Sequence, residues 1–279
     1  MQLLKYLLLF VVMTTVIKVD AAIGYDRALR VAKGDVNIAD TVGGEKAFRR
    51  VAFTVGTTNP NLNVNVSPMD YEKAFKDLKT GKIQLVITDR PPSAAKLKQD
   101  GIYCKRYACD PVLFIVKHNN PVDNISMANL KKIFDEDIIT WKPFTKQGYM
   151  IHLAGVQSGC PGFKALTTKV IGNNKIKAKY FKLTKASELI ILTTASEHML
   201  SFCGYISPRD DIKFLQVDGI TPTAKNIISG KYKPNISYYI CLNKKSGKTA
   251  FALAGLLTTH RVKNLLIQMG YLPVSVLRK

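Results

Sequence analysis

The sequence has little acidic charge, few histidines and cysteines, and no long hydrophobic run beyond its first 21 residues. Its 20 aspartates and glutamates stand against 41 lysines and arginines, a formal net charge of +21. The four histidines are scattered singly and the five cysteines form no C-x-x-C pair, so neither residue type indicates a zinc site. No later stretch has the length of a membrane helix, which excludes a protein with several membrane spans.

What is present indicates an ordered globular protein. The chain has 279 residues, of which 47% are apolar, and its mean hydropathy is close to zero. A chain of this length and composition can bury one large core or two modest ones. We therefore expect one or two compact lobes.

The first 21 residues have the pattern of a secretory signal. Lys5 gives a positive charge near the start, Tyr6–Ile17 is an apolar run, and Val19 and Ala21 are small residues before a cut at Ala22. The apolar run is short for a bilayer span, and no cysteine follows it that would carry a lipid. We expect a soluble protein that is secreted or periplasmic, with the signal cleaved near Ala21.

The positive charge favours anionic partners without selecting one. Removal of the first 21 residues leaves 39 basic against 19 acidic residues, a net charge of +20. Such a surface attracts small oxyanions, lipid head groups and nucleic acid, more weakly as the salt concentration rises. The lysines are spread along the chain and no nucleic-acid-binding signature accompanies them. We expect a solvated basic surface and no nucleic-acid partner.

The cysteines all lie in the exported part, where oxidation is possible. Their odd number leaves at least one unpaired. Cys104 and Cys109 are close enough in sequence to close a local loop, but the sequence leaves the pairing open. The five positions are Cys104, Cys109, Cys160, Cys203 and Cys241.

The first half of the chain reads as strands alternating with a helix. Leu29–Ala32 is predicted to be the first strand, ending in a turn at Gly34. Leu62–Ser67 alternates apolar and polar residues as a strand does. Tyr71–Thr80 is predicted as a helix closed by Gly81.

A polar pair follows the next predicted strand, Lys82–Thr88. Asp89 and Arg90 stand directly after its carboxyl end. In open α/β sheets, ligands bind at the carboxyl ends of the strands. Asp89 and Arg90 are therefore candidate ligand-binding residues.

The middle of the chain contains a capped helix and a second candidate site. Ser126 is a predicted helix N-cap, and Trp141 lies in an apolar turn, from Ile138 to Phe144, that is expected to be buried. Met150–Gly155 is predicted as a strand and Phe163–Ile171 as a helix. Between them stand Ser158, Gly159 and Cys160, and glycines with a hydroxyl before a helix favour a bound anion.

The remaining predictions complete an alternating pattern of helices and strands. Asp110–Lys117 and Ser237–Asn243 are expected to cross between lobes. The other predicted elements are a helix over Ala186–Leu200, a strand beginning at Gly204–Ser207, and closing helices over Thr249–Thr258 and Val262–Met269.

Several of these segments resemble the phosphate-binding proteins of phosphate ABC transporters, within the type II periplasmic solute-binding proteins. The resemblance covers nearly all of the mature chain and is firmest from Val86 onward. It is carried by the helix and tryptophan turn of Pro121–Phe144, by Val86–Ser93 (VITDRPPS), by Ser158–Cys160, and by the turns within Gly204–Ser207, Phe214–Thr223 and Ser229–Pro234.

The resemblance implies a two-lobed α/β fold of the type II periplasmic-binding-protein class, joined by hinge crossover strands. The expected boundaries are a signal over residues 1–21, lobe one over 22–110 plus 233–279, and lobe two over 111–232. The implied protein is a monomer that captures a small oxyanion, phosphate first, for the membrane permease of an ABC transporter. It is not an enzyme and needs no metal or cofactor.

The resemblance also assigns roles to the candidate residues. Asp89 accepts the remaining proton of phosphate, Arg90 is the cation, and Ser158, Gly159 and Cys160 offer donors. Gly34 belongs to the turn after the first strand, which touches the ligand in this family.

The chain departs from the family at three places. Ala154 stands where the family has an arginine four residues before the serine, and Cys160 replaces a threonine. Ser67–Glu72 stands where the family has a serine-rich turn, with one hydroxyl and two carboxylates. A lysine such as Lys33 is another candidate cation.

Two alternatives stay open, and the departures favour the first of them. One is a diverged binding-fold protein without phosphate recognition, which binds an acidic partner, polymer or surface through its basic face. The other is a hydrolase acting on a phosphate ester. No catalytic motif supports it, because Ser246–Thr249 lacks the upstream glycine of a P-loop and Asp135–Asp137 reads as a solvated helix end.

Overall fold

The structure, a computed structural model, describes residues 27–274 except 28, 43–45 and 147. It divides into two compact units. The first holds the described residues up to Tyr107 together with Tyr239–Asn264, and the second holds Ala108–Tyr238 and the described residues from Leu265 on. The lobe boundaries expected at residues 110 and 233 stay predictions. The candidate signal over residues 1–21 lies outside the described residues.

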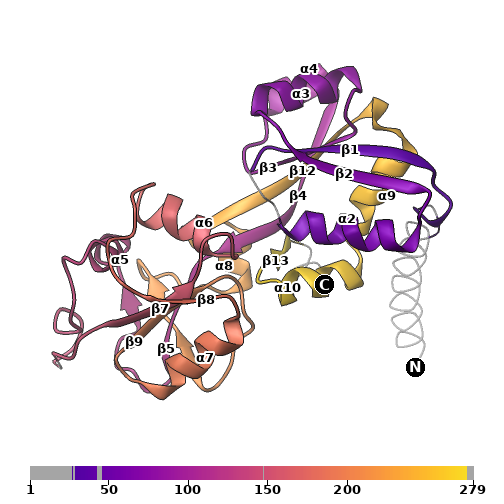
Figure 1. Cartoon of the computed structure of the whole chain (residues 1–279). Helices are drawn as coiled ribbons and strands as arrows, with labels where there is room; N and C mark the ends of the chain where they lie inside the picture. The colour runs from indigo at the N-terminus through magenta and orange to yellow at the C-terminus, as the bar shows by residue number, and fades with distance from the viewer. Residues whose placement is uncertain (1–26, 28, 43–45, 147, 275–279) are drawn as a thin grey trace, which may run out of the picture. The chain divides into compact units, whose positions relative to one another are not determined.

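The first unit is built on three parallel strands. β1 pairs with β2 along its whole length and with β3 near its carboxyl end, where Asp40 lies opposite Ile87. Helices α2 and α3 lie on opposite sides of the β1–β2 pair (Figure 1). The elements are β1 (Gly34–Asp40), α2 (Lys46–Thr58), β2 (Leu62–Pro68), α3 (Tyr71–Thr80), β3 (Leu85–Thr88), α4 (Ala94–Asp100), η2 (Lys244–Ser246), α9 (Gly247–Leu256) and the start of α10 (His260–Gln268).

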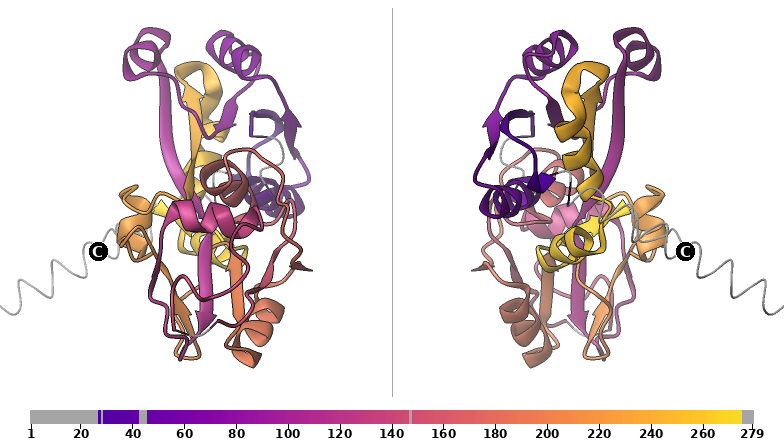
Figure 2. Two further views of the ribbon diagram at one scale, coloured as in Figure 1. Left: turned by 90° about the vertical axis from the view of Figure 1, so that its left-hand side faces the viewer. Right: turned by 90° about the vertical axis from the view of Figure 1, so that its right-hand side faces the viewer.

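Two long strands carry the chain across the unit boundaries. β4 (Ile102–Pro111) begins just after α4 and runs on as one long ribbon (Figure 2), and β12 (Asn235–Asn243) returns antiparallel to β3. The sheet order is β13-β4-β12-β3-β1-β2, where β13 is Leu272–Pro273. The strand expected over Asp110–Lys117 belongs to two strands, β4 and β5 (Leu113–Lys117), because Val112 separates them.

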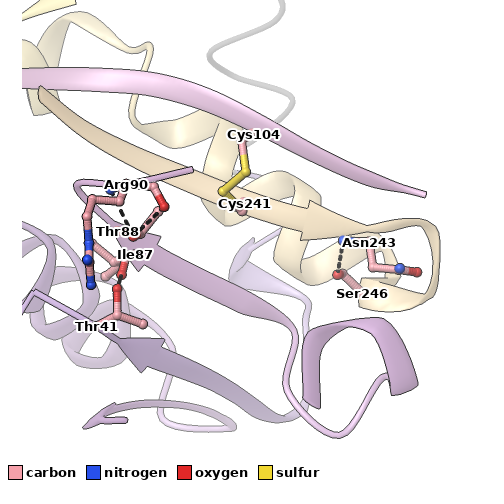
Figure 3. The surroundings of a disulfide bond; sticks show 8 residues. All are labelled: Thr41, Ile87, Thr88, Arg90, Cys104, Cys241, Asn243 and Ser246. Carbon is pink, nitrogen blue, oxygen red and sulfur yellow. Dashed lines mark hydrogen bonds between the residues drawn. A yellow bond between two sulfur atoms is a disulfide. The ribbon is translucent and has the colours of Figure 1, made fainter. Parts of the chain in front are cut away.

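A disulfide between Cys104 and Cys241 joins these two long strands within the first unit (Figure 3). The two cysteines are 137 residues apart in sequence. A local loop between Cys104 and Cys109 is therefore wrong. Cys109, Cys160 and Cys203 form no disulfide in the structure; Cys109 and Cys203 are buried, and Cys160 is partly exposed.

Helix α3 forms where the sequence predicts it because both of its ends carry strong signals. Asp70 is the N-cap and accepts from the backbone N–H groups of Glu72 and Lys73, and Gly81 ends the helix with a φ of +84°. Its apolar face buries Ala74, Phe75 and Leu78 in a cluster with β3 and β4 residues.

The first strand and the first helix differ from expectation. Leu29 and Arg30 are helical, and the first strand is β1, which begins at Gly34. Helix α2 was not predicted, although Phe48, Val51 and Ala52 are spaced as a helix requires and are all buried.

The second unit contains a five-stranded sheet in the order β10-β5-β9-β7-β8. β7 is parallel to both β8 and β9, whereas β5 is antiparallel to β9 and β10. Its elements are β5 (Leu113–Lys117), β6 (Asn124–Ile125), α5 (Met127–Phe134), β7 (His152–Val156), α6 (Phe163–Ala165), the π-helix η1 (Leu166–Val170), β8 (Phe181–Leu183), α7 (Ala186–Ala195), β9 (Met199–Cys203), β10 (Ile212–Phe214), β11 (Gln216–Val217), α8 (Ala224–Ile228) and β13 (Leu272–Pro273).

The capped helix and the buried tryptophan of this unit are confirmed. The Ser126 hydroxyl accepts from the Asn129 N–H at 3.1 Å at the start of α5. Trp141 is 2% exposed, and its indole N–H donates to the carbonyl of His198. Ile139 is an exception in the expected cluster, because 51% of its surface is exposed.

Two helical predictions in this unit are corrected. The helix expected to reach Leu200 ends at Ala195, because Met199 and Leu200 already belong to strand β9. Gly204 consequently follows a strand instead of beginning one. The helix expected over Phe163–Ile171 is a three-residue α-helical turn followed by the π-helix η1. Among the described residues, no helix is both long enough and apolar enough to cross a membrane.

Candidate functional site

The carboxyl ends of β1, β2 and β3 meet at one edge of the sheet in the first unit. The Thr41 N–H donates to the Ile87 carbonyl at 3.0 Å, and the Met69 N–H donates to the Asp40 carbonyl at 3.0 Å. These bonds fix the three strand ends against one another. In an open α/β sheet this edge is where a ligand binds.

Asp89 and Arg90 lie at this edge, as the sequence predicts. The Thr88 hydroxyl accepts from the Arg90 N–H at 3.1 Å and so closes the turn that carries them (Figure 3). The Asp89 side chain is 23% exposed and its carboxylate lies 3.8 Å from the Arg90 Nε. The Arg90 side chain is 76% exposed, with its guanidinium 5.2 Å from the ring centroid of Tyr71.

The structure does not bring Gly34 to this edge. Gly34 is the first residue of β1, whereas Asp89 follows the last residue of the neighbouring parallel strand β3. Gly34 is the first of the seven residues of β1, so six steps of about 3.3 Å, roughly 20 Å in all, separate it from Asp40 at the edge. Lys33, which precedes Gly34, also lies at the amino end of β1, away from the ligand-binding edge. The turn that follows the first strand instead begins at Thr41.

Two of the helix amides that follow the end of β2 are already used by the chain. Asp70 already accepts from two N–H groups of the first turn of α3, at 3.0 and 3.2 Å. The negative charge that the helix end favours is thus supplied by the chain itself. Asp70 is one of the two carboxylates that distinguish Ser67–Glu72 from the serine-rich turn of the family.

Ser158, Gly159 and Cys160 follow the carboxyl end of β7 in the second unit. Ser158 and Gly159 are exposed and Cys160 is half-buried. The Cys160 N–H donates to the Gln157 carbonyl, and the Gln157 N–H donates to the Leu183 carbonyl at the end of β8. The three residues therefore form a turn that is anchored to two strand ends and open to solvent.

A buried carboxylate occupies the start of the helix after this turn. Asp110 accepts from the Gly162 N–H at 2.6 Å and from the Tyr238 hydroxyl at 3.3 Å. Burial raises the pKa of Asp110 to about 7, although these hydrogen bonds and Lys164 act to lower it. The Phe163 N–H is also taken, by the Cys160 carbonyl. The expected cradle of free helix amides is therefore partly filled by the chain.

Glycines let the strand ends of this unit approach closely. A Cβ on Gly162, whose φ is +84°, would lie 2.6 Å from the backbone nitrogen of Gly204. Gly204 follows the end of β9, so it stands directly beside the segment that leads from the turn of Ser158 into α6. The segment that begins at Gly204 and the turn of Ser158–Cys160, which are far apart in sequence, are therefore neighbours in this unit.

The position of the family's arginine is closed to any charged group. Ala154 lies inside β7 and is fully buried. The next residue, Gly155, faces the ring of Phe202, and a Cβ there would lie 2.1 Å from the Phe202 Cζ.

Sequence reasoning missed two residues at the edge in the first unit. Asp40 ends β1 with its side chain fully buried, and Arg49 of α2 reaches it, Nη2 to Oδ2, at 3.6 Å. The sequence pattern that could have located them is the set of apolar residues Val36, Ile38 and Ala39, which are buried in β1 and place the end of this strand at Asp40.

The comparisons with known proteins agree with this architecture. The model of the PBP superfamily domain matches residues 32–258. No curated protein matches the sequence.

Solved structures with a similar fold include a possible phosphate-binding protein from Planctomyces limnophilus, with 19% identity, a TM-score of 0.71, and coverage of 87% of this chain and 93% of that one. The ABC-type phosphate transport receptor from Vibrio cholerae is 17% identical, with a TM-score of 0.64 and coverage of 86% and 99%. PstS from Borrelia burgdorferi is 18% identical, with a TM-score of 0.63 and coverage of 87% and 99%.

These likenesses confirm the expected type II periplasmic-binding-protein fold. The family match spans most of the chain, including the strand ends that carry Asp89 and Ser158. The chain is therefore a member of the PBP superfamily domain family.

Proposed function

We propose that the chain is an exported binding protein that captures a small oxyanion, phosphate first, and delivers it to the permease of an ABC transporter. The observation that carries the proposal is the place of Asp89 and Arg90, directly after a parallel strand at the edge where such sheets bind ligands. The solved proteins of similar fold are named for phosphate binding or phosphate transport, which supports the same ligand.

The proposed roles follow from the chemistry of phosphate. At neutral pH phosphate still carries a proton, whereas sulfate does not, so a carboxylate acceptor favours phosphate. We assign this acceptor role to Asp89 and assign donor roles to Ser158, Gly159 and Cys160. Arg90 contributes positive charge. We do not carry Gly34 into the site, because it lies at the other end of β1.

The proposal includes the oligomeric state and the location of the protein. We infer that it acts as a monomer outside the cytoplasm after cleavage of the signal near Ala21. We also infer that it binds its ligand without turning it over and without a metal or cofactor. Calorimetry with phosphate tests the central part of this function directly.

Phosphate binding is expected to depend on Asp89. The mature protein, unfolded and refolded to remove any bound anion, is titrated with phosphate by calorimetry. Asp89→Asn is expected to weaken phosphate binding about tenfold to a hundredfold, since a hydrogen bond to a charged group contributes about 1.5–3 kcal/mol. The preference for phosphate over sulfate should fall with it.

Asp210→Asn is the matched control. Asp210 is an exposed carboxylate, remote in sequence from the turn of Asp89 and Arg90 and from the turn of Ser158–Cys160. It should leave phosphate binding unchanged. The absence of heat at millimolar phosphate, with a folded protein, would contradict the proposed function.

A further inference from the structure

Arg49 combines a fixed position with a partly exposed guanidinium at the sheet edge of the first unit. Its Nη1 donates to the Val66 carbonyl of β2 at 3.0 Å, and its Nη2 lies 3.6 Å from the Asp40 carboxylate. The two contacts hold the side chain across the ends of β1 and β2. The side chain nevertheless keeps 38% of its surface exposed.

In the Asp40–Arg49 ion pair the carboxylate is buried and the guanidinium is partly exposed to solvent. The Asp40 side chain has no exposed surface, and its Oδ1 accepts from the Val42 N–H at 2.9 Å. A ligand arriving from solvent at this edge would meet the guanidinium and not the carboxylate. Guanidinium groups offer five N–H donors in a planar fork that suits a phosphate oxygen pair.

The other candidate cations are less well placed. Arg90 is at the same edge, but its side chain is 76% exposed and its guanidinium lies over the ring of Tyr71. Lys33 precedes β1 at the opposite end of the strand. The position of the family's arginine holds the buried Ala154. Of these four positions in the described part of the chain, position 49 has a guanidinium that is hydrogen-bonded to the backbone of a strand end and still partly exposed.

We propose that Arg49 is the principal cation of the oxyanion site, replacing the arginine that the family places at position 154. This inference rests on the proposed function and deepens it. Asp40 then acts as a positioning residue, which orients the guanidinium without touching the ligand. The guanidinium then offers its exposed N–H donors to the anion, while Asp40 offsets part of its positive charge.

The experiment compares phosphate affinities of variants of the mature protein at constant ionic strength. Arg49→Met removes the charge and keeps much of the side-chain length, and it is expected to weaken phosphate binding about tenfold to a hundredfold. Arg49→Lys keeps the charge but loses the fork, so it should recover part of that loss. Arg90→Met should cost less than Arg49→Met.

Arg50→Met is the matched control. Arg50 is the next residue of the same helix and is exposed, so its removal changes the net charge equally. It should leave the phosphate affinity nearly unchanged. The denaturation midpoint of each variant is measured in parallel, so that loss of binding is compared only among folded proteins.

The outcomes separate the two proposals. If the unmodified protein binds no phosphate, the proposed function fails. If it binds phosphate and folded Arg49→Met binds as tightly as Arg50→Met, the role of Arg49 is overturned while the function stands. If Arg49→Met does not fold, the comparison passes to Arg49→Lys, and an unchanged affinity in that folded variant overturns the claim that the fork binds the ligand.

Discussion

Removing the Cys104–Cys241 disulfide is expected to lower the free energy of unfolding of the first unit by about 4–5 kcal/mol. The bond closes a loop of 137 residues, and the entropy that a cross-link removes from the unfolded chain grows with the length of the loop. The disulfide is removed in the double variant Cys104→Ala, Cys241→Ala. Alanine is chosen over serine because Cys241 is fully buried and a serine there would bury a hydroxyl. Urea unfolding followed by circular dichroism measures the change.

Reductant provides the control. It should shift the urea midpoint of the unmodified protein toward that of the double variant, and it should leave the double variant unchanged. A thiol titration of the denatured, unreduced protein should find three thiols, because five cysteines are present and two are paired. Five thiols, or a midpoint indifferent to reductant, would contradict the pairing.

The second large effect is expected from Asp110, whose carboxyl should make the protein less stable as the pH rises from about 4 to about 7. The pKa of Asp110 is raised by burial from 3.8 to about 7 in the folded protein. Between these values the folded chain keeps a proton that the unfolded chain releases, so raising the pH favours unfolding. At 1.36 kcal/mol per pH unit, the loss is on the order of 4 kcal/mol.

Asp110→Asn isolates this contribution, because other carboxylates also titrate. Hydrogen bonds from Lys131 and Arg209 lower the pKa of Asp135 and Asp211, and these groups add stability as the pH rises. The asparagine keeps an acceptor for the Gly162 N–H and has no proton to lose. The difference in unfolding free energy between the two proteins should therefore change across pH 4–7 and level off above it. Parallel pH curves would show that Asp110 is not the source.

Local signals explain why part of the fold was predictable. The helices that begin after Asp70 and Ser126 carry an N-cap and an apolar face within a few residues, and both are found where expected. The first strand was misplaced because Leu29 is apolar and buried although the chain around it is helical. A short apolar run does not distinguish a helix from a strand.

The candidate site was less predictable because its contacts join distant parts of the chain. Asp110 receives one hydrogen bond from a residue 52 positions away and another from a residue 128 positions away. No pattern in the sequence around Asp110 reveals those donors. Asp89 was found because strand and turn are adjacent, whereas Arg49 was missed because its role depends on the end of β1 at Asp40.

The side chains at positions 155 and 202 compete for the same space in the core of the second unit. The ring of Phe202 fills the space where a side chain at 155 would begin, and it also lies 5.3 Å from the ring of Phe134 and 5.2 Å from that of Tyr180. A larger residue at 155 would displace the ring and disturb the packing of α5 against the sheet. Changes at positions 155 and 202 are thus constrained to occur together, with growth at one offset by truncation at the other.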